Sequence, residues 1–194
     1  MKKRRKILGV ALVLSLVALL LPATIFADDE GTVSCTVSGK LISLTVTEGS
    51  IVFGILDLST TKNSALYDLT NNANGMTPAQ TQTITNTGSA AQDFNMKTSN
   101  AIGTADWTLH ATTPGSELFT YGYLVSDTEY DGTAGIGAFT KWATADSYVA
   151  DAGGDDVAAD GVKYLELEIG MPTLSVDYGE HTITVTVQAT EHTA

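Results

Sequence analysis

Cysteine is almost absent from this chain: Cys35 is the only one. No intrachain disulfide can form, so the fold must rest on its hydrophobic core. Cys35 alternates with Val33 and Val37, which predicts a small buried side chain on the apolar face of a strand. Two alternatives stay open for this residue. It could form a disulfide with a cysteine of another molecule, or it could be a reactive thiol.

Histidine is scarce, and the common catalytic signatures are missing. The three histidines are His110, His181 and His192. No H-E-x-x-H, G-x-S-x-G, P-loop or G-x-G-x-x-G pattern occurs. His181 and His192 flank the last expected strand, whose extended length of roughly 30 Å or more keeps them from sharing a metal. We therefore expect no enzyme activity, no catalytic residue and no residue that binds an organic cofactor.

Basic residues are few, and half of them stand at the start of the chain. There are 10 Lys and Arg against 22 Asp and Glu. Positions 2–6 are all basic, residues 7–21 are almost wholly apolar, and Ala27 precedes Asp28. This order is typical of a secretory signal peptide over residues 1–27, followed by one secreted domain over 28–194. A retained membrane anchor is the alternative, but the apolar run is shorter than the about 20 residues that span a bilayer.

Removal of the signal would leave a strongly acidic domain. Five basic and 22 acidic residues remain, a net charge of 5 − 22 = −17. Such a surface repels nucleic acid and anionic lipid, so neither is an expected partner, and membrane contact is expected only through the signal before cleavage. The predicted location is outside the cytoplasmic membrane, either secreted or at the cell surface.

What the chain does contain is a series of short alternating segments. Val, Ile, Thr and aromatic residues recur with period two between Gly-, Asn- and Asp-containing turns, and there are only four prolines. One or two helical turns are expected over 141–151, with Trp142 packed inward. The pattern predicts an all-β fold, a single antiparallel β-sandwich with about nine strands. The expected strands are residues 32–38, 41–47, 50–58, 80–86, 91–98, 106–112, 117–126, 162–170 and 181–190.

Three of these segments carry sharper expectations. In 181–190 the odd-numbered positions from 183 onward are apolar and are predicted to face the core. In 162–170 Glu166 and Glu168 alternate with apolar residues and are expected on the solvent side. Segment 50–58 is apolar on both faces, which predicts a central strand.

The densest acidic stretch, residues 146–161, is the candidate metal site. Calcium takes six to eight oxygen ligands and tolerates flexible loops, so a loop-bound calcium is one interpretation and a solvated polar loop is the other. A second acidic loop with Asp127, Glu129 and Asp131 would add ligands if the two loops meet. The candidate calcium ligands are Asp146, Asp151, Asp155, Asp156 and Asp160.

Two short stretches resemble the TasA/camelysin family. They are Phe53-Gly54-Ile55-Leu56-Asp57-Leu58 after a signal peptide, and the segment 78–89 with Ile84, Asn86, Gly88 and Ser89 at the corresponding places. The resemblance spans residues 49–94 and more loosely the last strand. It implies a secreted jelly-roll protein that assembles into extracellular matrix fibres. The chain has Pro78-Ala79-Gln80 where the family has Pro-Gly-Asp, and the metallopeptidase activity attributed to camelysin is not carried over, because no zinc motif is present.

A second resemblance covers residues 172–190. This segment is similar to the end of a group of small secreted bacterial proteins without a characterised function. It implies secretion and a β-sandwich fold rather than a particular role.

The first functional hypothesis is a structural subunit of a surface layer or matrix fibre. The alternating segment with Val33, Cys35 and Val37 could complete its own sheet or a neighbour's, and head-to-tail strand exchange of the second kind yields filaments. The expected partners are other copies of the chain or other surface proteins.

The alternative is an extracellular binding module for polysaccharide or for a calcium-bridged cell-wall polymer. Exposed aromatic side chains, with Trp107 and Trp142 stacking on sugar, would favour this module. Core packing of both tryptophans is the competing interpretation.

Overall fold

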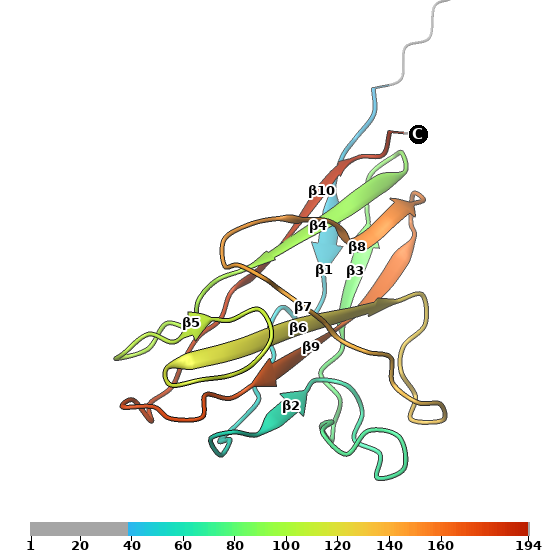
Figure 1. Cartoon of the computed structure of the whole chain (residues 1–194). Helices are drawn as coiled ribbons and strands as arrows, with labels where there is room; N and C mark the ends of the chain where they lie inside the picture. The colour runs from blue at the N-terminus through green and yellow to red at the C-terminus, as the bar shows by residue number, and fades with distance from the viewer. Residues whose placement is uncertain (1–38, 194) are drawn as a thin grey trace, which may run out of the picture. The chain divides into compact units, whose positions relative to one another are not determined.

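Residues 39–193 are the part of the chain that the computed structural model describes, and they contain ten strands in two sheets (Figure 1). The predicted signal segment, the expected strand 32–38 and the residues Val33, Cys35 and Val37 lie outside this part. The larger sheet has the order β1-β3-β9-β6-β5, with β2 also paired to β9 and β7 to β6, and the smaller sheet has the order β10-β4-β8. The strands are β1 Leu44–Val46, β2 Thr61–Asn63, β3 Gln82–Asn86, β4 Gln92–Thr98, β5 Thr108–Leu109, β6 Leu118–Ser126, β7 Thr140–Lys141, β8 Val149–Val157, β9 Val162–Gly170 and β10 Val185–Glu191.

The all-β prediction is confirmed, with a sandwich-like arrangement of the two sheets. All strand pairs are antiparallel except β5 with β6, which is parallel. Residues 39–193 contain no helix, so the helical turns expected over 141–151 are wrong; these residues form turns and parts of β7 and β8. In this part of the chain no helix has the length and apolarity needed to cross a membrane.

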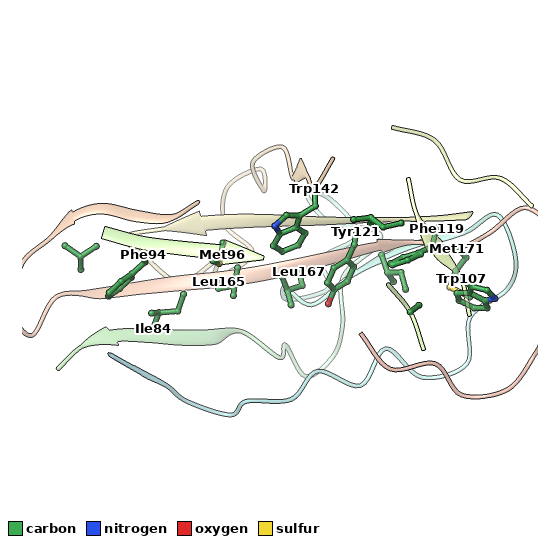
Figure 2. Close-up of a cluster of buried hydrophobic side chains, with 14 residues drawn as sticks. Ile84, Phe94, Met96, Trp107, Phe119, Tyr121, Trp142, Leu165, Leu167 and Met171 are labelled. Atoms are coloured by element: carbon green, nitrogen blue, oxygen red, sulfur yellow. The ribbon is translucent and has the colours of Figure 1, made fainter. Parts of the chain in front are cut away.

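The core lies between the sheets because strands of both have alternating apolar positions (Figure 2). Phe94 and Met96 of β4 are fully buried against Ile84, Leu165 and other residues of the larger sheet. The odd-numbered apolar residues of β10 pack on the same cluster, as predicted.

Both tryptophans belong to this core. Trp142 is 0 % exposed and Trp107 is 5 % exposed. Trp142 stacks on Tyr121 at a ring-centroid distance of 5.5 Å. The core interpretation of the tryptophans is confirmed, so neither is a surface platform for stacking on sugar.

The expected central strand over 50–58 is wrong. No strand forms there; Ile55 is fully exposed, and Gly54 has a φ of 76°. The backbone of Val52 bonds to the side-chain amide of Gln80 instead of to a neighbouring strand. The amide oxygen accepts the Val52 N–H at 2.6 Å, and the amide nitrogen donates to the Val52 carbonyl at 3.3 Å. The segment covers the core edge through Phe53, which packs edge-on against Tyr121.

Glu166 is not on the solvent side, contrary to expectation. It is only 3 % exposed. β2 and β3 pair with successive stretches of the same edge of β9, and Glu166 lies in β9 between these stretches. Its carboxylate accepts hydrogen bonds from Ser64 Oγ at 2.5 Å and from Thr81 Oγ1 at 2.6 Å. The chain between Ser64 and Thr81 crosses this face of the sheet and thus buries Glu166, although the alternation along β9 places Glu166 on the side away from the core.

Candidate functional site

Three side chains with metal-ligand atoms converge at one end of the smaller sheet. Asp93 comes from β4, Asp155 from β8, and His192 follows the last residue of β10. His192 Nδ1 lies 2.7 Å from Asp93 Oδ1 and 3.3 Å from Asp155 Oδ1. A further carboxylate, Asp156 Oδ1, lies 4.0 Å from His192 Nε2. One imidazole therefore faces three carboxylates.

The pairing of β4 with β8 brings these residues together. Between Gln92 and Phe94 the register on β8 moves from Val157 to Gly154, and between Phe94 and Met96 it moves on to Val149, so β8 contains bulges. A bulge leaves backbone groups without ladder partners. Asp93 Oδ1 accepts the N–H of Asp156 at 3.0 Å. Asp93 thus also supports the backbone of the bulged strand.

The charges of the cluster shift two pKa values in opposite directions. Hydrogen bonding to Asp93 is the main reason why the pKa of His192 is raised, and the nearby carboxylates add to it. Burial acts to raise the pKa of Asp93, but the hydrogen bonds from the Asp156 N–H and from His192 outweigh it, so this pKa is lowered. The arrangement favours a positive charge at the position of the imidazole edge, whether a proton or a cation.

The five predicted calcium ligands are spread over a strand and its two flanking turns. Of these five, only Asp155 belongs to the cluster, with Asp156 beside it. The expected loop is mostly strand, since β8 covers residues 149–157. The other three candidates are Asp151 in β8, Asp146 before it and Asp160 after it.

Backbone conformation gives a second reason for the aspartates in this stretch. Asp146, Asp151, Asp156 and Asp160 have φ values of 59°, 56°, 46° and 61°. Aspartate adopts this left-handed region more readily than most residues. At one of the bulges Asn95 Oδ1 accepts the N–H of Asp151 at 2.9 Å. Much of the acidic pattern therefore serves the turns and bulges of β8.

The second acidic loop does not join the cluster. Asp127 and Asp151 line the same open cavity of ≈ 410 Å³, together with Lys163. The Lys163 ammonium lies 2.6 Å from Asp127 Oδ1, so a side-chain cation already neutralises this carboxylate. Asp131 accepts hydrogen bonds from its neighbour Thr133.

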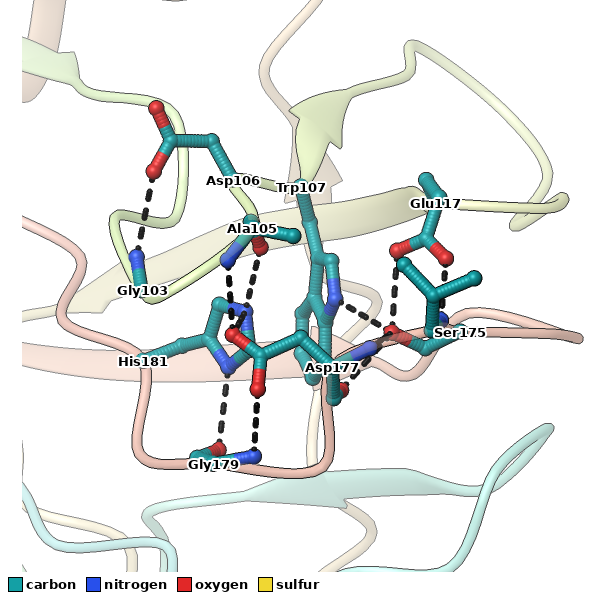
Figure 3. A network of polar contacts seen from close by, with 10 residues as sticks. Gly103, Ala105, Asp106, Trp107, Glu117, Ser175, Asp177, Gly179 and His181 are labelled. Atoms are coloured by element: carbon teal, nitrogen blue, oxygen red, sulfur yellow. Dashed lines mark hydrogen bonds and ion pairs between the residues drawn. The ribbon is translucent and has the colours of Figure 1, made fainter.

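A second polar network surrounds Trp107 and includes His181 (Figure 3). His181 stacks on Trp107 with ring centroids 3.7 Å apart. Its Nδ1 lies 3.1 Å from the carbonyl oxygen of Gly179, and its Nε2 lies 3.0 Å from that of Ala105. Asp177 Oδ2 is 3.5 Å from His181 Nε2.

This network contains serine, histidine and aspartate, but its serine and histidine do not form a nucleophile–base pair. Ser175 Oγ accepts from Trp107 Nε1 at 2.9 Å and from the N–H of Asp177 at 3.0 Å, and its hydroxyl has Glu117 Oε2 within 2.9 Å. No hydrogen bond joins Ser175 to His181 in the network that Figure 3 draws. A serine is activated by a base within hydrogen-bond reach. The network thus acts as a structural tie between Trp107, the start of β6 and the segment 175–181.

Sequence reasoning missed Asp93 and His192 as members of the cluster. Sequence spacing relates His192 only to His181, at the other end of the last expected strand, whereas the residues that His192 contacts are far away in the sequence. Asp93 alternates with the buried residues of β4, so its position on the outer face of the strand could be predicted from the sequence. The sequence does not show that β10 and β8 pair with β4 on its two sides, and this pairing creates the cluster.

No family model, curated protein or solved structure matches this chain.

Proposed function

We propose that the chain is a secreted or cell-surface structural protein, a subunit of an extracellular fibre that assembles by strand exchange. The observation that carries this proposal is the outer edge of β10. Among the described strands, β10 pairs with β4 alone, in a register without interruption from Val185 to Glu191.

The backbone of β10 offers a row of hydrogen-bonding groups on its outer side. Ser99 N–H donates to the carbonyl of Thr184, and His192 N–H donates to that of Ala91. Because antiparallel partners alternate, the even-numbered residues of β10 face β4 and the odd-numbered ones face away. Val185, Val187 and Ala189 thus direct N–H and C=O groups to the side on which β10 pairs with no other described strand.

The apolar side chains at this edge are also incompletely covered. Val187 and Ala189 pair with Met96 and Phe94, which are both fully buried, yet Val187 and Ala189 themselves are only partly buried. A strand added beside β10 would extend the sheet over the open side of the core, and this burial favours its addition.

The opposite edge of the same sheet is protected. β8 has bulges and left-handed residues, and Asp151, Asp155 and Asp156 stand along it. Bulges and charges of this kind keep an edge from pairing with another chain. β10 has no such device along its regular stretch, which makes it the accepting edge.

The donor in this proposal is the segment with Val33, Cys35 and Val37 of another copy. Its three apolar side chains have the same spacing of two residues as Val185, Val187 and Ala189. The described chain begins at Gly39, and the next residue, Lys40, forms an ion pair with Glu191 at the end of β10. The first described residues therefore lie close to the accepting edge of their own chain.

The test is negative-stain electron microscopy of residues 28–194 at rising protein concentration, with and without millimolar calcium. We expect filaments from the wild type and from a Ser34→Asp/Thr36→Asp variant. A Val33→Asp/Val37→Asp variant adds the same charge on the apolar side of the segment and should form none. Compact single particles from the wild type in every condition would overturn spontaneous assembly.

A deletion of residues 28–39 separates exchange between copies from completion within one chain. The shortened protein should stay folded by circular dichroism, form no filaments and bind a synthetic peptide of residues 28–39. An unfolded product would show instead that the segment completes its own sheet.

A further inference from the structure

We propose that Asp93, Asp155 and His192 form a binding site for a divalent transition-metal ion of the zinc class. This site is independent of fibre assembly and would exist in a single copy of the chain. It differs from the calcium loop expected from the sequence in both its residues and its metal.

The geometry provides three ligands, two from β4 and β8 and one from the residue that follows β10. The candidate ligand atoms are one imidazole nitrogen and one oxygen from each of two carboxylates, and all lie within 4.8 Å of one another. Zinc takes nitrogen and carboxylate ligands at about 2.0–2.2 Å in tetrahedral sites. An ion placed among the three atoms would reach all of them after small side-chain rotations. Asp155 is 68 % exposed, so water can enter as the fourth ligand.

No lysine or arginine in the described part of the chain forms an ion pair with Asp93, Asp155 or Asp156. The ion pairs of Asp93, Asp155 and Asp156 all go to the same partner, His192. Even a protonated imidazole leaves three carboxylates with one positive charge. A divalent ion in place of the Nδ1 proton adds one further positive charge at the focus of the carboxylates.

The ligand types select the metal. Calcium requires six to eight oxygen ligands, whereas the cluster offers two or three carboxylates and an imidazole. Imidazole suits zinc, copper and nickel. The two ligands besides Asp155 are largely shielded, with exposed side-chain fractions of 16 % for Asp93 and 23 % for His192, which limits competition from water.

The test is isothermal titration calorimetry of residues 28–194, prepared without a polyhistidine tag and freed of metal by a chelator. Zinc chloride and calcium chloride are titrated separately into the wild type. His192→Gln and Asp155→Asn remove one ligand each. Asp160→Asn is the matched control, since it removes the same charge from the same acidic stretch outside the cluster, and asparagine tolerates the φ of 61°.

We expect one zinc ion per chain, with the affinity lowered about tenfold or more by either ligand variant and unchanged in Asp160→Asn. Zinc should also raise the unfolding temperature of the wild type but not of His192→Gln. Asp93→Asn is a poorer test, because Asp93 also holds the bulge of β8. Three results would overturn the site. They are zinc binding with unchanged affinity in both ligand variants, no zinc binding by the wild type, and calcium binding as tight as zinc binding.

Discussion

At the scale of single residues, Glu166 shows the clearest conflict between its chemistry and its position. Burial raises the pKa of its carboxyl, and the hydrogen bonds from Ser64 and Thr81 only partly oppose this shift. Because the pKa is higher in the folded state than in the unfolded one, protonation favours folding. The contribution is fully present at low pH and is lost as pH rises from 4.5 through the raised folded-state pKa.

We therefore expect Glu166→Gln to change stability in a pH-dependent way. Glutamine keeps the shape and an oxygen acceptor, and it avoids the cost of burying a charge. Relative to the wild type, the variant should gain free energy of unfolding at pH 8, and this gain should shrink toward pH 4. Urea unfolding at both values measures the difference, with the exposed Glu180→Gln as control. A variant that is destabilised equally at both pH values would contradict this account of the carboxyl.

The same residue shows what alternation in a sequence can establish. Period two correctly placed Leu165, Leu167 and Ile169 in the core. It gave the wrong environment for Glu166, because alternation reports which face of a strand a residue occupies and not what covers that face. Here the face is covered by the chain from Ser64 to Thr81. This segment is far from β9 in the sequence and has no apolar pattern that would predict its contact with β9.

At the scale of elements, β8 has the least strand-like sequence of the long strands. Glycine and aspartate are unfavourable in regular strands, so residues 146–161 resembled a loop. The structure uses both residue types for the bulges. At Gly153, the Cβ of any other residue would lie 2.8 Å from Phe94 Cβ and 3.1 Å from its carbonyl oxygen. This close approach of two strands requires glycine.

Replacement of Gly153 by alanine should loosen the smaller sheet. The added methyl group would push β8 away from a fully buried Phe94, and overpacking of this kind costs about 1–3 kcal/mol. Gly135→Ala is the control, because its Cβ would meet nothing within 4 Å, and surface changes of this kind alter the free energy of unfolding by about 0.5 kcal/mol or less. Denaturant unfolding compares the two variants. Equal stability of both proteins would mean that β8 does not pack on Phe94 as described.

The element predictions succeeded where a segment's own sequence determines its structure. β3, β4, β6, β9 and β10 all lie within or almost within expected strands. The strand prediction for segment 50–58 was wrong although its residues favour strands, because no described strand pairs with it; the side chain of Gln80 bonds to the backbone of Val52 instead. The grouping of Asp93, Asp155 and His192 was not predicted for the related reason that it depends on which strands pair, and short period-two segments do not encode their partners.

At the scale of the whole molecule, the two edges of the smaller sheet have different properties. One edge is bulged and acidic, and the other is regular and leaves apolar side chains partly open. In a closed monomer both edges need protection. This asymmetry supports growth in one direction, since a head-to-tail contact uses a donor and an acceptor that lie at different places on the surface.

Assembly of this kind must also overcome the charge of the subunits. Each copy of residues 28–194 has a net charge of 5 − 22 = −17, and the proposed donor segment begins with Asp28, Asp29 and Glu30. Added salt shortens the screening length from about 30 Å at 0.01 M to about 10 Å at 0.1 M. Filaments should therefore form faster in 0.1 M sodium chloride than in 0.01 M, as followed by light scattering.

Neutralising the leader tests whether this repulsion acts at the exchanged segment. Asp28→Asn/Asp29→Asn/Glu30→Gln should assemble faster than the wild type at 0.01 M salt and should respond less to added salt, because fewer like charges approach the acidic neighbour. The matched change Asp127→Asn/Glu129→Gln/Asp131→Asn removes the same charge from an exposed loop distant in sequence from β10, so it should leave more of the salt response intact. If salt instead slows assembly, the copies attract one another through opposite charges, and strand exchange driven by apolar burial is the wrong mechanism.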